Sequence, residues 1–216
     1  MPKNKENDYI YNADIKEWVE SGLGFTRLLS DYEIQKYCEE MSMISPFKIG
    51  KQKKNDKGEK IVSYGLSEYG YDVRLGSKIK VPLQRTSENK PIMLDPKNPN
   101  ENHWEVIDLD KPFILKGNSM ILVETVERFK MPYNVVALVM AKSTYSRLGV
   151  MTPHAVFEPD WEGVPSMALM NKGENSVLIH PNEGFAQVMF FSAQQPNAGY
   201  EDGKYQNQSG VAIPKV

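Results

Sequence analysis

From Ile61 onward, the sequence is a succession of short β-type runs separated by turn residues. Glycine, proline or asparagine stands between nearly all of these runs, and no long helical pattern alternates with them. The runs are KIVSYG, YDVRLG, KIKVPL, WEVIDL, KPFILKG, SMILVETVERF, VVALVMAKS, SVLIHP and FAQVMFF. Many short strands without alternating helices indicate an all-β sandwich, barrel or jelly roll rather than a parallel α/β sheet.

Two stretches fall outside this pattern. Residues 85–105 are rich in asparagine and proline, which predicts a long exposed loop with His103 at the surface. The N-terminal part carries helical signals: a short helix over residues 14–20, and a second after Ser30, which forms a capping box with Glu33. The apolar stripe expected along the second helix is Ile34, Tyr37, Cys38 and Met41.

Length and composition bound the remaining possibilities. A chain of 216 residues, 40% hydrophobic and 25% charged, suits one domain, which we assign to 29–216 after an N-terminal extension, 1–28. The formal charge of −2 argues against nucleic-acid binding but leaves room for a local phosphate pocket. The single Cys38 excludes an internal disulfide, and with only three histidines it excludes a cysteine-rich zinc site. With no apolar run of membrane-spanning length and a polar start, we expect a cytoplasmic protein.

The stretch AKSTYSRLG, residues 141–149, could carry chemistry. It follows the apolar run VVALVM and offers two cations, Lys142 and Arg147, with two hydroxyls, Ser143 and Thr144, within one turn. Such a turn can hold phosphate oxygens through charge-assisted hydrogen bonds and exposed backbone donors. The alternative is a capped turn that leads into a short helix.

Five motifs resemble, in order and spacing, the dCTP deaminase branch of the dUTPase superfamily. They are SEYGYDVRLG (67–76), AKSTYSRLG (141–149), FEPDWEG (157–163), EGFAQVMFF (183–191) and GKYQNQSG (203–210). The resemblance runs from about Leu28 to the C-terminus. It implies a distorted β-barrel or jelly roll that assembles as a homotrimer, with active sites shared between subunits.

The resemblance also implies a site for a deoxypyrimidine nucleoside triphosphate. Lys142, Ser143 and Thr144 look like the family's triphosphate and catalytic loop, and Arg147 like its active-site arginine. The implied metal is Mg²⁺ carried on the phosphates, which supply most of its ligands, so we expect no metal site in the protein itself.

The same resemblance assigns a sugar pocket and a lid. Glu158 stands where the family has the acidic residue that meets the deoxyribose 3′-hydroxyl, and Trp161 shapes the same turn, residues 157–163, which we call the sugar turn. Gln187 resembles a pocket-wall residue, although pairing with backbone explains it equally well. Residues 200–216 resemble a lid that closes over the triphosphate, and its candidate ligands are Lys204 and Gln208.

Asp72 and Arg74 lie in the first of these motifs. For these two residues we expect a structural ion pair near the trimer centre rather than a catalytic role.

Ala168 departs from the family pattern. Relatives that deaminate dCTP carry a glutamate ten residues after the acidic residue of the sugar turn, and in this chain that position is Ala168. Deamination needs a group that takes a proton from the attacking water and returns one to the leaving amine. Alanine can do neither. Strand alternation puts Ala168 on one face with Ser166 and Met170, and Pro165 upstream indicates a strand start or a bulge.

Three interpretations of Ala168 remain open. It is an introduced substitution that traps substrate, a natural loss that leaves a nucleotide-binding protein, or a sign of different chemistry. His154, four residues before Glu158, is the candidate substitute base for the third interpretation. A histidine that only packs or hydrogen-bonds at the pocket rim is the alternative.

The leading interpretation is a zinc-independent hydrolase of the dCTP deaminase type, which converts dCTP to dUTP and ammonia and is impaired by Ala168. A dUTP diphosphatase, with Glu158 or Asp160 activating water, is the alternative enzyme. A catalytically silent nucleotide-binding or regulatory homologue is the third candidate.

Overall fold

The computed structural model describes residues 26–200 and 202–215, so the predicted helix over 14–20 lies outside the described residues. The helical elements are α2 (Asp31–Met41), the 3₁₀ turn η1 (Glu101–His103) and α3 (Ser143–Ser146). The strands are β1 (Ile44–Ser45), β2 (Lys51–Lys54), β3 (Lys60–Ser67), β4 (Gly70–Pro82), β5 (Trp104–Asp108), β6 (Phe113–Leu115), β7 (Ser119–Thr125), β8 (Arg128–Lys130), β9 (Val135–Ala141), β10 (Val150–Met151), β11 (Ala155–Phe157), β12 (Glu162–Gly163), β13 (Ser166–Asn171), β14 (Val177–Ile179) and β15 (Gly184–Ser192).

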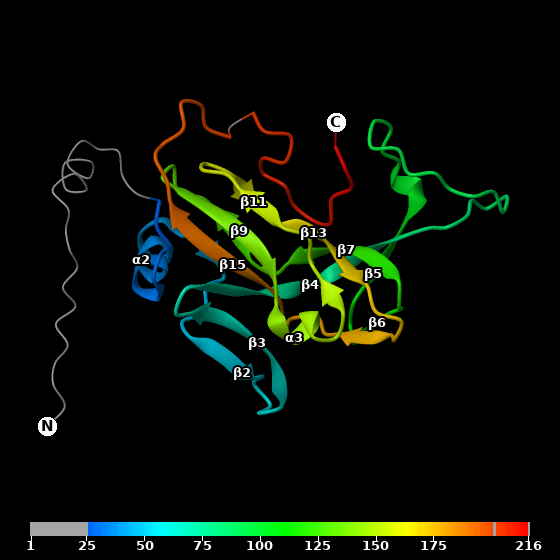
Figure 1. Ribbon diagram of the computed structural model, residues 1–216, viewed down its shortest axis with the longest axis horizontal. Coiled ribbons are helices and arrows are strands. Elements are labelled where there is room, and N and C mark those ends of the chain that lie inside the picture. Colours follow the sequence, from blue (N-terminus) through cyan, green and yellow to red (C-terminus); the bar gives the residue numbers. More distant parts are fainter. Residues whose placement is uncertain (1–25, 201, 216) are drawn as a thin grey trace, which may run out of the picture.

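The strands form a curled antiparallel half-barrel, so the prediction of an all-β fold with few helices is confirmed (Figure 1). The main sheet follows the order β10-β13-β7-β4-β15-β9-β11, and β3 and β5 also pair with β4. Two small sheets, β1-β8-β12 and β6-β14, complete the fold. Within the described residues, no helix combines the length and apolar character needed to span a membrane.

The longest strand, β4, merges two runs that the sequence pattern separates, YDVRLG and KIKVPL. Its first half pairs with β15 and β3, and its second half with β7 and β5. The register against β7 shifts between Leu75 and Ile79, where Gly76 faces Glu124. A Cβ on Gly76 would lie 2.6 Å from Cγ and 3.1 Å from the carbonyl oxygen of Glu124, so a larger residue there would force Glu124 to shift.

The core follows strand alternation and one face of α2. In β9, Val135, Ala137 and Val139 are buried, whereas Leu138 and Met140 point outward. The buried residues of α2, Ile34 and Cys38, join the same cluster. The capping box is present, since Ser30 N donates to Glu33 Oε2 at 3.2 Å. The prediction that Met41 belongs to the buried stripe is wrong: it is 39% exposed in the last turn of the helix.

Two buried ion pairs tie the sheet together, and they correct the expected pairing of Asp72 with Arg74. Nε of Arg74 donates to Oε1 of Glu127 at 2.7 Å, and Nζ of Lys142 donates to Asp72 at 2.5 Å. Residues two apart on a strand share a face but lie almost 7 Å from each other. Glu127 and Lys142 arrive from neighbouring segments and come closer, so each member of the expected pair has a different partner.

The predicted long polar loop is present between β4 and the short turn η1. Its predicted end at residue 105 is wrong, because Trp104 and Glu105 begin β5, and His103, expected at the surface, is half-buried. The loop extends away from the sheet (Figure 1).

We expect Cys38 to be inert toward alkylating reagents in the folded protein. The side chain is 8% exposed, and burial raises the pKa of its thiol to about 12, so the reactive thiolate is scarce near neutral pH. Iodoacetamide labelling followed by mass spectrometry should therefore modify Cys38 only after denaturant is added. Equal labelling rates with and without denaturant would contradict this burial.

Candidate functional site

A pocket of about 440 Å³ opens on the outer face of the sheet, beneath the C-terminal segment. Its walls come from β7, β11, the turn that follows β11, β13 and the tail. The lining residues are Leu122, Ala155, Val156, Phe157, Glu158, Trp161, Pro165, Ser166, Met167, Ala168, Tyr200, Tyr205, Gln208, Ala212, Ile213 and Pro214. Among the described residues that line it, Glu158 is the only carboxylate. The pocket is therefore mostly apolar, with one anionic side chain at its wall.

Ala168 is part of the pocket floor. It lies on β13 directly opposite Leu122 of β7, and both residues line the pocket. The predicted alternation is confirmed: Ser166, Ala168 and Met170 are partly exposed, whereas Met167 and Leu169 are buried. β13 starts directly after Pro165, as predicted for a residue that lacks a backbone donor. A longer side chain at position 168 would therefore point into the pocket.

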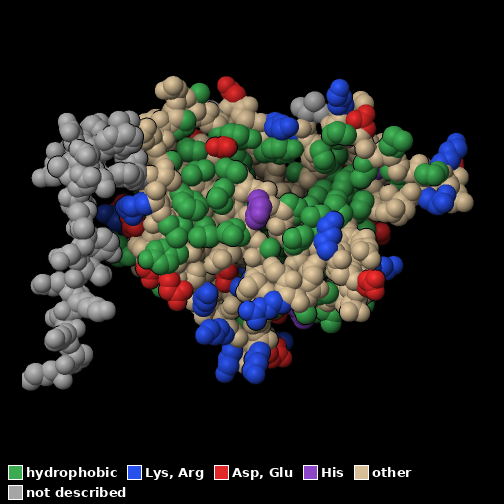
Figure 2. Space-filling view, viewed as in Figure 1, with side chains coloured by type: hydrophobic (Ala, Val, Ile, Leu, Met, Phe, Trp, Pro, Cys, Tyr) green, Lys and Arg blue, Asp and Glu red, His purple; other side chains and the backbone are tan. Residues whose placement is uncertain are grey.

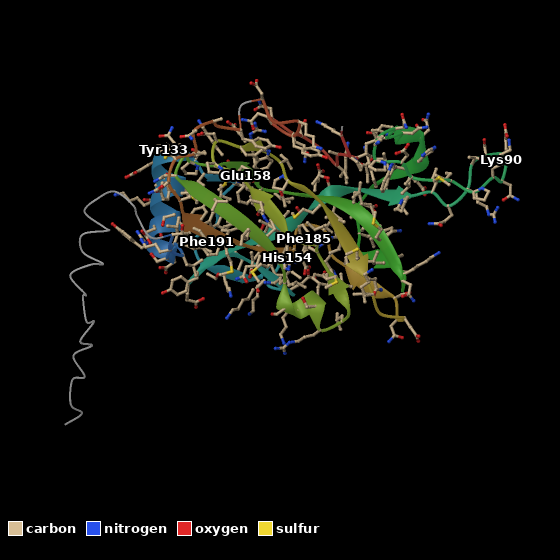
Figure 3. The ribbon with its side chains drawn as sticks, turned by 45° about the horizontal axis from the view of Figure 1, so that its top comes forward. Lys90, Tyr133, His154, Glu158, Phe185 and Phe191 are labelled. Carbon is tan, nitrogen blue, oxygen red and sulfur yellow. The ribbon has the colours of Figure 1, made fainter. Side chains whose placement is uncertain are left out.

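The sugar turn after β11 is fixed by aromatic packing and by an unusual backbone. Asp160 adopts a φ of 65°, and Trp161 N donates to Glu158 O at 3.1 Å, which closes the turn. The Trp161 ring stacks on Phe157 with centroids 4.9 Å apart. Glu158 itself is exposed. Glu158 and His154 flank the two ends of β11 (Figure 3).

The C-terminal segment closes the pocket by pairing with this turn. A parallel bridge joins Gly163 to Gln208, with Val164 N donating to Gln208 O at 2.8 Å. The Gln208 amide donates to Val164 O at 2.9 Å, and Trp161 Nε1 donates to Tyr205 O at 2.9 Å. The tail therefore lies against the pocket, held to the turn by one backbone bridge and by hydrogen bonds from the Gln208 and Trp161 side chains.

The predicted phosphate loop forms α3 at the end of β9 and does not line this pocket. Ser143, Thr144 and Arg147 are exposed, whereas Lys142 is 7% exposed and bound to Asp72. Backbone donors of Tyr145 and Ser146 bond to Lys142 O, each at 3.0 Å, and so close the first turn. The capped turn into a short helix is therefore present, with two hydroxyls and one guanidinium facing solvent.

Three other predicted residues lie outside the pocket. His154 is exposed just before β11, and Gln187 is half-buried on β15 between its partners Asp72 and Met140. Lys204 is exposed, and its ammonium donates to Lys215 O at 2.9 Å.

Sequence reasoning missed several wall residues. Leu122 follows from the pairing of β7 with β13, which a single sequence does not reveal. The two tyrosines of the tail were visible as aromatic residues in a polar segment, but their place beside Trp161 depends on how the tail folds back. The missed residues are Leu122, Tyr200, Tyr205, Ala212, Ile213 and Pro214.

We expect Gly163→Ala to release the tail. The added Cβ would lie 2.9 Å from the Trp161 ring and 3.0 Å from N and O of Gln208, so the tail must shift. Trypsin should then cut after Lys204 faster than in the parent. Gly173→Ala is the control, because its Cβ would meet no atom closer than 3.4 Å, and it should leave this cleavage rate unchanged.

Comparison with known proteins places this geometry in a family. Residues 28–193 match the family model described as dCTP deaminase-like. The dCTP deaminase of Janthinobacterium sp. (strain Marseille) is 41% identical over 190 residues, which cover 87% of this chain and 98% of that protein. The dCTP deaminase of Helicobacter pylori (strain G27) is 38% identical over 194 residues, covering 88% and 98% respectively.

Among solved structures, the 2′-deoxycytidine 5′-triphosphate deaminase from Agrobacterium tumefaciens aligns with a TM-score of 0.53 at 15% identity. The match covers 78% of this chain and about half, 48%, of that longer one, and it supports the fold. The family match and the curated relatives together show that this chain belongs to the dCTP deaminase-like family.

Proposed function

We propose that this protein binds a deoxypyrimidine nucleoside triphosphate in the pocket between β13, the sugar turn and the tail, as a dCTP deaminase-type protein. The observation that carries the proposal is the convergence of Glu158, Trp161, Ala168 and Gln208 on one pocket of about 440 Å³. Glu158, Trp161 and Ala168 come from the turn after β11 and from β13, and Gln208 comes from the tail forty residues later. In this proposal residues 29–216 form the nucleotide-binding domain, 200–216 its lid and 1–28 an extension.

The proposed reaction is hydrolytic deamination. Water adds to C4 of the cytosine, the C4–N bond breaks, and ammonia leaves to give dUTP. The attacking water must give up a proton and the leaving amine must gain one. Because Ala168 has no ionisable group, we propose that this chain has lost its proton shuttle and is impaired, while Ser143 and Arg147 still orient water and charge.

We further propose a homotrimer whose sites are shared between subunits. Ser143, Thr144 and Arg147 are exposed in this chain and do not line its pocket, so a neighbouring copy is needed to bring such groups to the ligand. The outward face of β9 and β11 is apolar and uncovered, with Leu138 38% and Val156 51% exposed. Figure 2 shows hydrophobic side chains gathered on the face that carries these strands.

We propose that Mg²⁺ enters with the nucleotide. Within the described residues, no three His, Cys, Asp or Glu side chains come together to hold a metal ion. A metal bound through phosphate oxygens needs few protein carboxylates, and this pocket is lined by a single carboxylate, Glu158, among the described residues. When bound, the ion would neutralise phosphate charge.

A catalytically silent nucleotide-binding homologue is the second candidate, and Ala168 itself favours it. The alternative enzyme, a dUTP diphosphatase, would need Glu158 or the neighbouring Asp160 to activate water at the α-phosphate. Parallel assays of ammonia and pyrophosphate release on one sample separate these three functions.

The main test is Ala168→Glu. General acid–base catalysis is worth about 10² to 10⁴ in rate, so the variant should release ammonia from dCTP faster by about that factor. Its affinity for nucleotide should stay within about twofold of the parent, because the other binding residues are unchanged. Ala168→Gln is the matched control, with similar volume and no acid–base group.

The opposite outcome is equally specific. If Ala168→Glu stays silent with dCTP, the parent turns over another nucleotide, and His154→Ala abolishes that turnover, then the deaminase proposal fails. His154 would in that case be the base of a different reaction.

A second test concerns the phosphate loop. Arg147→Ala and Ser143→Ala should each weaken dCTP or dUTP binding about ten- to hundredfold, since each removes a contact to phosphate. His103→Ala should have no effect. If sites are shared, mixing Arg147→Ala subunits with Glu158→Ala subunits should restore some tight sites. A monomer in light scattering that still binds tightly would exclude the shared site.

A further inference from the structure

The phosphate loop supplies less positive charge than its sequence suggests. A nucleoside triphosphate carries about four negative charges, and about two remain when Mg²⁺ is bound to it. Of the two cations in 141–149, Lys142 is 7% exposed, and its ammonium lies 2.5 Å from the Asp72 carboxylate. This buried pair is neutral overall, so only Arg147 presents a free charge from α3. If the proposed ligand is correct, attraction must also come from elsewhere.

A strongly basic hairpin stands next to this loop. Residues 48–60 hold six lysines and two acids, a formal charge of +4 in a chain whose total is −2. This segment contains β2, the turn after it and Lys60, the first residue of β3, and all of its charged side chains are exposed. The lysines are Lys48, Lys51, Lys53, Lys54, Lys57 and Lys60.

These lysines are not neutralised within the described part of the chain. None of the six forms an ion pair there, and Glu59 instead accepts a hydrogen bond from Asn55 at 2.7 Å. Lys54 and Lys60 are direct cross-strand partners, an arrangement of like charges that destabilises a hairpin. Lysines that do pair with a carboxylate occur elsewhere in the described residues: Lys36, Lys78, Lys80, Lys90 and Lys142.

The hairpin is physically linked to the phosphate loop. Val62 N of β3 donates to Oε2 of Glu183 at 2.6 Å. At the next residue, a Cβ on Gly184 would clash with Ser63 O and lie 3.4 Å from Cε of Lys142. β3, the start of β15 and the base of α3 therefore meet at one glycine. The hairpin and α3 lie on the same side of the molecule, where Lys and Arg side chains gather (Figures 1 and 2).

We propose that the basic hairpin, residues 48–60, collects nucleoside triphosphates for the phosphate loop, an inference that rests on the proposed function. Charge of one sign beside a site raises the local concentration of an oppositely charged ligand and its association rate. The effect extends over about 10 Å at 0.1 M salt and about 3 Å at 1 M, so it depends on salt. The hairpin increases the association rate of the nucleotide, whereas contacts in the pocket and with the lid determine its dissociation rate.

The test compares two variants with the same charge change. The hairpin variant changes four lysines to glutamine: Lys51, Lys53, Lys54 and Lys60. The control variant changes four exposed lysines outside the hairpin, on the loop before β5 and on the turns before and after β6: Lys90, Lys97, Lys111 and Lys116. Lys90 lies at the far end of the molecule (Figure 3). Stopped-flow Trp fluorescence measures association and dissociation of dCTP and dUTP with Mg²⁺ at low and high salt.

We expect the hairpin variant to associate about five- to tenfold more slowly than the parent at about 20 mM salt, and within about twofold at about 0.5 M. Dissociation rates should not change, and the control variant should behave like the parent. Arginine at the same four positions should restore the parent association rate, because the effect depends on positive charge and not on the ammonium group of lysine.

Other results overturn the proposal. Unchanged association in the hairpin variant at low salt, with nucleotide still bound, overturns it and leaves the proposed function intact. Unchanged association together with new aggregation would show that these lysines only protect an edge strand. Hairpin-dependent binding of a 20-residue single-stranded DNA, without an effect on dCTP, would assign the surface to nucleic acid. A parent that binds neither dCTP nor dUTP overturns both proposals.

Discussion

Pairing along the single strand β4 is the constraint on which the rest of this structure depends. Four strands pair with it, two along each half, and the register irregularity between Leu75 and Ile79 separates the two halves. An irregularity of this kind bends a strand and increases its twist, which is how one sheet can curl into a half-barrel. Because Gly76 leaves room for Glu124 there, one small residue permits the curvature. The first half of β4 supports β15 and β9, and α3 follows β9. The second half supports β7, which together with β13 forms the pocket floor.

The C-terminal tail closes one side of the pocket by pairing with the turn that follows β11. β13 and β7 present a shallow outward face, and a pocket forms where residues 205–214 fold back over it. Backbone bonds between the tail and the sugar turn, such as Val164 N to Gln208 O, do not depend on side-chain identity. The side chains then fix the register: the Trp161 indole reaches Tyr205 O, and the Gln208 amide reaches Val164 O. Backbone pairing therefore holds the tail against the pocket, and a few side chains fix the register of the tail.

Local patterns predicted what depends on local physics. The strand runs, the capping box of α2 and the face on which Ala168 lies follow from short-range periodicity, and all three are confirmed. Pairing between distant segments was not predictable from periodicity. The merging of two runs into β4, the partners of Asp72 and Arg74 and the strand-like tail depend on contacts over long sequence separations. The family resemblance predicted that Ala168, Glu158, Trp161 and Gln208 share one site, and they line one pocket. It did not predict that Lys142 is buried.

Lys142 and Ala168 lie in different parts of the fold and have different surroundings. The Lys142–Asp72 pair fixes the base of α3 in the sheet, and its lost hydration is compensated only while both partners remain. The exposed groups of α3, Ser143, Thr144 and Arg147, therefore stand on a fixed base. Position 168 lies on another strand, lines the pocket and carries no structural hydrogen bond through its methyl group, so its identity affects chemistry far more than folding. In the proposed function, nucleotide affinity and turnover therefore depend on separate parts of this fold. A chain built in this way can lose the reaction and keep the ligand.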